Sequence, residues 1–183
     1  MKLEIIQHSH LSINSCYIFN NFLDNLDYLN IVKNKIKELT IKDEMQHSTN
    51  VKANMTSYEK LLEEEEFNSL HKKILETIAI CFQLRTPHHR APFNLKMTNS
   101  WGMLHKQNER SVLHCHQGSD WSAAFYLQIP HQTIFRLPEF DGQINLEDNL
   151  LVFFRGITQH SVDPFQGEGE RISMACNINQ EFK

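Results

Sequence analysis

The chain has 183 residues, of which 40% are hydrophobic, and its formal net charge is -4. A chain of this length can bury one hydrophobic core, so we expect a single domain spanning 1–183. The acidic balance argues against a nucleic-acid-binding surface, and no apolar run reaches the length of a membrane span. Four cysteines without a CxxC pair predict the reduced thiols of a cytoplasmic protein rather than a disulfide framework. The N-terminal segment carries polar residues within its apolar stretch, so we expect no secretory signal.

The start of the chain predicts strands, then a helix, then a loop. Residues 3–19 alternate loosely and are rich in β-forming types, which indicates one or two strands. Apolar residues then recur at helical spacing over 24–39, which predicts the first helix. Residues 40–55 are polar and lack periodicity, so we expect a loop there.

A second, longer helix is expected after this loop. Thr56 followed by Glu59 forms a candidate capping box, and an apolar stripe continues from there to Phe82. The acidic run 63–66 would lie on the solvated face of this helix. Pro87 and Pro92 then end the helical part of the chain.

From Phe93 onward the chain consists of short apolar segments separated by turn residues. Several short strands at close spacing are typical of a sandwich or barrel, here with the N-terminal helices packed outside. We therefore divide the single domain into a helical support region with an N-terminal strand, 1–92, and a β core, 93–183. The predicted strands of the core are 93–105, 111–116, 121–129, 132–137, 150–154, 159–165 and 171–178.

Three histidines of this β core form a candidate metal site. His114 and His116 are two residues apart, so on an extended segment their side chains point to the same face. His160 follows far downstream, where an apolar strand gives way to a polar turn, and it would supply a third imidazole. The competing interpretation is that the histidine pair only forms a polar face of its strand.

Arg171 is the second notable residue, because its segment RISMACNI is otherwise apolar or small. A buried guanidinium needs an anionic partner, and its fixed set of donors suits a carboxylate bound through two hydrogen bonds. The partner is either an organic acid bound near the metal or a neighbouring acidic side chain. The acidic candidates are Asp163, Glu168 and Glu170.

The other histidines are interpreted as structural. His8 and His10 share the spacing of the metal pair but lack a third partner, and His88 and His89 adjoin Pro87 in a basic stretch. His105 and His131 are expected to serve packing or to face solvent. Cys115 should point away from the metal face if its strand is regular.

The two segments HCHQGSDWSAAFYLQIP and FFRGITQHSVDPFQGEGERISMACN resemble the 2-oxoglutarate/Fe(II)-dependent oxygenases. The resemblance is to a small branch found in marine bacteria and their phages, and it covers about residues 95–179. It implies a fold that is α+β and mainly β, with a double-stranded β-helix (jelly-roll or cupin-like) core and the N-terminal helices outside. It also implies that His114 and His160 bind Fe(II), and that Arg171 and Ser173 bind the distal carboxylate of 2-oxoglutarate.

The chain departs from the family at the third ligand. The family usually has Asp or Glu two residues after the first histidine, and this chain has His116 there. Three neutral imidazoles leave the site one negative charge short, so it should hold iron less tightly when 2-oxoglutarate is absent. Asp120 is the nearest spare carboxylate and is the alternative third ligand. Ala123-Ala124, where Ser-Gly is common, is a further departure, which would narrow the mouth of the pocket.

The resemblance thus implies an enzyme, a dioxygenase of the hydroxylase type, that couples oxidative decarboxylation of 2-oxoglutarate to oxidation of a small-molecule or peptide substrate. One alternative is a three-histidine, cupin-type dioxygenase that does not use 2-oxoglutarate. A non-catalytic metal-binding protein of the same fold is the other.

Overall fold

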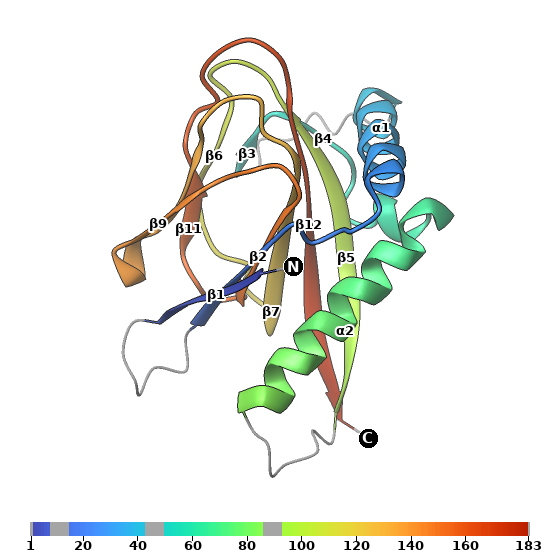
Figure 1. Ribbon diagram of the computed structural model, residues 1–183, viewed down its shortest axis with the longest axis vertical. Helices are drawn as coiled ribbons and strands as arrows, with labels where there is room; N and C mark the ends of the chain where they lie inside the picture. The colour runs from blue at the N-terminus through green and yellow to red at the C-terminus, as the bar shows by residue number, and fades with distance from the viewer. Residues whose placement is uncertain (1, 8–14, 43–49, 86–92, 183) are drawn as a thin grey trace.

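The computed structural model describes residues 2–7, 15–42, 50–85 and 93–182. These residues form two antiparallel β-sheets and two α-helices (Figure 1). In spatial order, the larger sheet contains β1 (Lys2–Gln7), β2 (Ser15–Asn20), β10 (Leu150–Arg155), β7 (Trp121–Gln128), β12 (Arg171–Phe182), β5 (Phe93–His105) and β4 (Asn54–Met55). The smaller sheet contains β3 (Val51–Lys52), β6 (Arg110–His114), β11 (His160–Val162), β8 (Ile134–Leu137) and β9 (Gly142–Asn145).

The chain passes back and forth between the two sheets after β5. It enters the smaller sheet at β6, the larger at β7, the smaller at β8 and β9, the larger at β10, the smaller at β11 and the larger at β12. This alternation is the winding of a double-stranded β-helix, or jelly roll. It brings β6 and β11 side by side, although they are far apart in the sequence.

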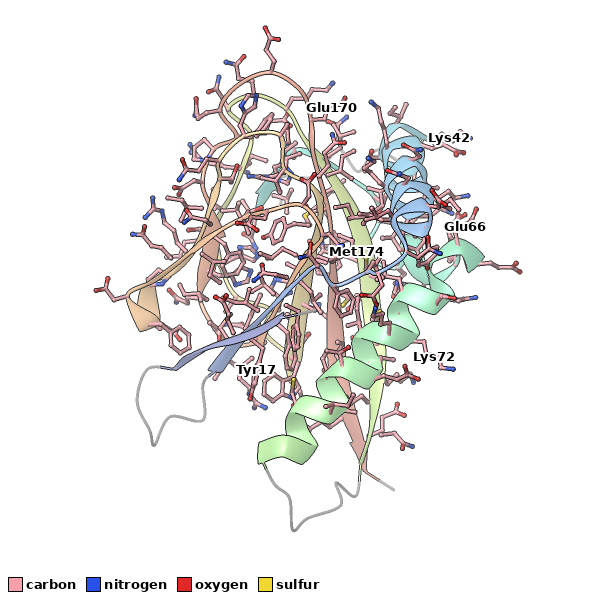
Figure 2. The ribbon with its side chains drawn as sticks, in the orientation of Figure 1. Tyr17, Lys42, Glu66, Lys72, Glu170 and Met174 are labelled. Carbon is pink, nitrogen blue, oxygen red and sulfur yellow. The ribbon has the colours of Figure 1, made fainter. Side chains whose placement is uncertain are left out.

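The larger sheet is buried on both faces, because side chains of each strand alternate between two apolar layers. On β7, Phe125 and Leu127 pack toward the helices, whereas Ala124 and Tyr126 pack toward the smaller sheet. Met174 of β12, labelled in Figure 2, belongs to the layer on the helix side. The inner layer, between the two sheets, is where polar side chains also gather.

Both helices, α1 (Leu26–Lys42) and α2 (Asn68–Arg85), lie on the side of the larger sheet that faces away from the smaller one (Figure 1). The charged ends of Lys42 and Lys72 extend outward from them (Figure 2). Helix α1 packs closely on β5 at Gly102, where a Cβ atom would lie 2.8 Å from Cγ2 of Ile36. No helix in the described part of the chain is long and apolar enough to cross a membrane.

The predicted strands of the β core and the first helix are confirmed, with shifts of a few residues at their ends. The prediction of a helix beginning at Thr56 is wrong. The N–H of Gly102 donates to Thr56 Oγ1 (3.0 Å), and the Thr56 N–H donates to the Gly102 carbonyl oxygen (3.0 Å). Since Thr56 is tied to β5 in this way, it does not cap a helix, and α2 begins only at Asn68.

Two short 3-10 helices, η1 (Lys60–Leu62) and η2 (Glu65–Phe67), occupy the segment before α2. The acidic run 63–66 therefore lies beside these turns and not on the long helix. Two of its members, Glu64 and Glu66, form ion pairs with Lys35 of α1 at 2.8 and 3.1 Å. The predicted loop 40–55 contains the short strands β3 and β4, and β9 was not predicted. A third 3-10 helix, η3 (Pro138–Phe140), precedes β9.

Candidate metal centre

The three predicted histidines converge at one end of the smaller sheet. Strand β6 ends at His114 and β11 begins at His160, and these two residues are direct cross-strand partners. His116 follows two residues later, in the turn after β6. One ring nitrogen from each of the three lies within 4.8 Å of the other two. The distances between ring centroids are 4.3 Å for His114 and His160, and 5.1 Å from His116 to each of them.

Hydrogen bonds at the Nδ1 atoms orient His114 and His160. Nδ1 of His114 lies 2.7 Å from the Val112 carbonyl oxygen, and Nδ1 of His160 lies 3.0 Å from the Thr158 carbonyl oxygen. A carbonyl oxygen only accepts, so each Nδ1 carries the proton and each Nε2 keeps its lone pair. This tautomer is the one in which a histidine binds a metal through Nε2.

His116 is oriented by a side chain, the amide of Asn177 on β12. Nδ1 of His116 donates to Asn177 Oδ1 over 2.6 Å, and the Ser122 hydroxyl donates to the same oxygen over 2.9 Å. The amide nitrogen of Asn177 donates instead to Asn99 Oδ1 (3.5 Å), and an amide oxygen only accepts, so in this arrangement His116 too carries its proton on Nδ1. Its Nε2 atom is buried and has no hydrogen-bond partner among the described residues. A buried lone pair without a partner is the state that a metal ion would satisfy.

Burial keeps the three imidazoles neutral. It lowers the pKa of His116 to about 4 and lowers that of His114, and it holds the pKa of His160 well below its ordinary value, with a further contribution from the other two rings. Neutral imidazole is the metal-binding form, so few protons compete with a metal at neutral pH. Three imidazole nitrogens suit Fe(II), Zn(II), Cu(II) or Ni(II) rather than Mg(II) or Ca(II).

The turn that carries His116 is held against the loop after β10 at Gly156. The His116 N–H donates to the Gly156 carbonyl oxygen (2.7 Å), and the Gly156 N–H donates to the Asp120 carbonyl oxygen (3.1 Å). A Cβ atom at position 156 would overlap the carbonyl group of Ser119. The close approach that positions His116 therefore requires glycine here.

Asp120 lies outside the histidine group. One of its carboxylate oxygens accepts a hydrogen bond from the N–H of Gln180 (2.8 Å), and its own N–H donates to Asn179 Oδ1 (3.0 Å). The carboxylate thus fastens the turn to β12, and the structure brings His116 rather than Asp120 to the other two histidines. Cys115 is also outside the group. It lines a cavity that His114 and His116 also border.

Arg171, the first residue of β12, is 1% exposed. Its Nη1 donates to the Asp163 carbonyl oxygen (3.2 Å), while Nε and Nη2 are buried without a hydrogen-bond partner among the described residues. Burial lowers its pKa to about 10, so the guanidinium still carries its charge at pH 7. None of the ion pairs in the described part of the chain involves Arg171: the Asp163 carboxylate binds Arg136, and Glu170 binds Lys37. The cation is therefore buried with two free donors.

Strand alternation places Arg171, Ser173, Ala175 and Asn177 on the one face of β12 that looks toward the smaller sheet. The same sheet face carries Tyr126 opposite Ser173. The sequence did not predict a role for Asn177. Its separation of six residues from Arg171 does place both residues on the same face of a regular strand.

Two connected hollows adjoin the histidines. An inner chamber of about 40 Å³ is bounded by the three rings and by residues of both sheets. An outer cavity of about 310 Å³ lies at its mouth, and Val51, Trp101, His114 and His116 border both. The outer cavity is otherwise lined by Asn50, Tyr58, Asn99, Cys115, Gln117 and Asn177. The described lining of this cavity contains no Asp, Glu, Lys or Arg.

No protein-family model matches the chain, and no curated protein matches it. Solved structures do match. The viral collagen prolyl hydroxylase of Paramecium bursaria Chlorella virus-1, in complex with 2-oxoglutarate, has a TM-score of 0.64 and 17% identity, covering 89% of this chain and 94% of that one. A Pseudomonas putida prolyl-4-hydroxylase has a TM-score of 0.61 and 15% identity, covering 93% and 95%. The α-ketoglutarate-dependent epimerase SnoN has a TM-score of 0.66 and 11% identity, covering 89% and 76%. The chain has the double-stranded β-helix fold of these oxygenases.

Within this double-stranded β-helix, the histidines at the end of the smaller sheet and Arg171 on the larger sheet both face the space between the two sheets. The histidines offer three metal-binding nitrogens, and the buried guanidinium offers two nitrogens, Nε and Nη2, whose N–H groups have no partner among the described residues. The donor set fits a divalent metal, and the buried cation fits the carboxylate of a small organic acid.

Proposed function

We propose that this protein is an Fe(II)- and 2-oxoglutarate-dependent oxygenase of the hydroxylase type. The observation that carries the proposal is the buried Arg171 guanidinium, whose Nε and Nη2 have no partner among the described residues, between the same two sheets as three histidines whose ligand nitrogens lie within 4.8 Å of one another. A buried cation without a counter-ion is costly, and a bound dicarboxylate would supply the missing charge. The fold shared with known oxygenases supports the same conclusion.

In this proposal His114, His116 and His160 hold the iron, and Arg171 with Ser173 holds the distal carboxylate of 2-oxoglutarate. When bound, iron and 2-oxoglutarate together supply the oxidative decarboxylation that drives oxidation of the substrate. The chain contributes orientation, because carbonyl oxygens and Asn177 fix the imidazoles, and it contributes the small inner chamber that the three rings border. The Arg171 charge also adds electrostatic attraction for a dianionic cosubstrate.

The outer cavity is the proposed place of the substrate. Its described lining offers amide groups and the aromatic rings of Tyr58 and Trp101 but no charge, so an ionic group entering it would lose hydration without gaining a counter-ion. We therefore propose a small-molecule or peptide substrate whose reacting part is uncharged. The matched structures include a prolyl hydroxylase in complex with a peptide fragment and HygX with hygromycin B bound, so the fold accommodates both kinds of substrate.

The convergence of three imidazoles favours one second candidate, a three-histidine dioxygenase that does not use 2-oxoglutarate. Succinate production from 2-oxoglutarate by the Fe(II)-loaded protein distinguishes the two. The proposed enzyme should release succinate and carbon dioxide in a metal-dependent reaction. A three-histidine dioxygenase should bind the metal and leave 2-oxoglutarate unchanged.

The binding of 2-oxoglutarate can be followed directly by anaerobic titration into the Fe(II) protein, using the metal-to-ligand charge-transfer band. Arg171→Ala should weaken binding by roughly 2–5 kcal/mol, the usual scale for truncating one partner of a buried charge pair. Arg171→Lys should recover only part of this loss, because an ammonium group cannot reproduce the planar fork. If Arg171→Ala binds 2-oxoglutarate as tightly as the parent, the distal carboxylate does not bind at Arg171. The three-histidine dioxygenase would then be the better-supported function.

The metal ligands are tested by iron stoichiometry. His114→Ala and His160→Ala should fold but lose bound Fe(II), because an open metal site is not the core of the protein. His116→Ala should also lose iron, whereas Asp120→Ala should keep it. The reverse result for the last two variants would make Asp120 the third ligand.

A further inference from the structure

His105 is a second buried polar group near Arg171 whose hydrogen-bonding capacity is unused. It is 1% exposed, and neither Nδ1 nor Nε2 has a hydrogen-bond partner among the described residues. An imidazole always carries at least one N–H donor, and a buried donor without a partner costs about 1–3 kcal/mol. The sequence predicted packing or solvent exposure for this residue. Solvent exposure is wrong, and packing alone does not explain two unused ring nitrogens.

The position of His105 connects it to the proposed 2-oxoglutarate site. His105 on β5 and Arg171 on β12 are direct cross-strand partners, so their side chains leave the sheet on the same face, with Cβ atoms about 5 Å apart. Trp101 and Met103, four and two residues before His105, share that face and border the inner chamber. The imidazole and the guanidinium therefore lie next to each other on the sheet face that borders the chamber.

The two groups do not satisfy each other. The guanidinium only donates, and neither ring nitrogen of His105 accepts from it. The positive charge of Arg171 contributes, after burial, to holding the pKa of His105 well below its ordinary value. Glu109 is one of the acidic groups whose charge reaches Arg171, but its carboxylate accepts the N–H of Lys106 (2.6 Å). A carboxylate bound at Arg171 has four lone-pair positions, so it can accept from the imidazole as well as from the guanidinium.

We propose that His105 donates a second hydrogen bond to the distal carboxylate of the 2-oxo acid anchored by Arg171. This inference rests on the proposed function and adds a specificity-determining residue to it. His105 and Arg171 together select a five-carbon dicarboxylate over 2-oxo acids that lack the distal carboxylate. The neutral imidazole directs its N–H to the carboxylate without adding a second positive charge beside the guanidinium.

The test compares two ligands that chelate the metal alike and differ only at the far end, 2-oxoglutarate and 2-oxopentanoate. Both are titrated anaerobically into the Fe(II) protein, and the ratio of their dissociation constants is compared between parent and variants. His105→Phe should reduce the preference for 2-oxoglutarate at least tenfold while the affinity for 2-oxopentanoate changes less than threefold. His105→Gln, which keeps an N–H donor, should retain part of the preference. His71→Phe, at another buried histidine, should leave the ratio unchanged.

If His105→Phe lowers the affinity for both ligands equally, or for neither, the ratio of the dissociation constants is unchanged. That result would indicate a purely structural role for His105 and overturn the proposal. A second measurement uses the parent protein, so its result does not depend on whether the variants fold. In the Zn(II)-loaded protein, 2-oxoglutarate should shift the His105 ring ¹⁵N resonances and 2-oxopentanoate should leave them in place. Identical spectra with the two ligands would refute the role of His105. If 2-oxoglutarate gives no charge-transfer band in the parent protein, the proposed function itself fails.

Discussion

Replacing Gly156 by alanine should disrupt the metal centre from a residue that offers no ligand atom. The added Cβ would overlap the Ser119 carbonyl oxygen and lie 2.9 Å from its carbonyl carbon, closer than the 3.0 Å that real Cβ atoms respect. Because main-chain atoms cannot turn aside as a flexible side chain does, the turn must move. Overpacking of this kind costs about 1–3 kcal/mol, and the two main-chain hydrogen bonds between Gly156 and the turn contribute about 1 kcal/mol each.

We therefore expect Gly156→Ala to lower the free energy of unfolding by about 3–5 kcal/mol. It should also weaken Fe(II) binding at least tenfold, the scale for losing the support of a metal ligand, because the His116 main chain moves with the turn. Urea unfolding and anaerobic iron titration measure the two effects. Gly118→Ala is the matched control in the same turn. A Cβ at position 118 meets nothing within 4 Å, although its φ of +88° adds strain. Iron affinity within threefold of the parent in Gly156→Ala would refute the reasoning.

Three further predictions concern polar side chains. Asn177→Leu should weaken Fe(II) binding roughly 10–100-fold in an anaerobic titration, and Ser122→Ala should do so much less, because of the two only Asn177 is hydrogen-bonded to a histidine of the proposed centre. Asn149→Ala should lower the free energy of unfolding by about 2–4 kcal/mol in urea, since the Asn149 amide satisfies both main-chain groups of Leu23. Burial lowers the pKa of His71 to about 4, so as the pH falls from 6.5 the unfolded chain takes up the proton first and stability drops by roughly 3 kcal/mol down to pH 4. His71→Gln should remove that part of the acid sensitivity, and an unchanged pH profile would contradict it.

The sequence predicted the β core and the histidine group because both depend on local periodicity. Alternation of apolar and polar types places strands, and the i, i+2 spacing of His114 and His116 places two imidazoles on one side of the chain. The burial of Arg171 was also predictable, because an apolar segment surrounds it. The choice among its partners was not predictable, since two of the three acidic candidates, Asp163 and Glu170, bind other cations.

What the sequence did not predict depends on contacts between distant segments. Thr56 has the local pattern of a helix cap, but its hydrogen bonds to Gly102 of β5 outweigh that preference. The pairing of His105 with Arg171 requires the register of β5 against β12, which no local pattern encodes. The requirement for glycine at position 156 likewise follows only from the close contact between this residue and the turn that carries His116.

The Asn177 amide oxygen lies 2.6 Å from the Nδ1 atom on which His116 carries its proton. One nucleotide change turns an asparagine codon into an aspartate codon and would place a carboxylate at that position. A negative charge there would make the imidazole a stronger electron donor, and would return to the centre the charge that it lacks when histidine replaces a carboxylate ligand. The reduction potential of the bound metal could thus evolve without any change in the atoms that touch it.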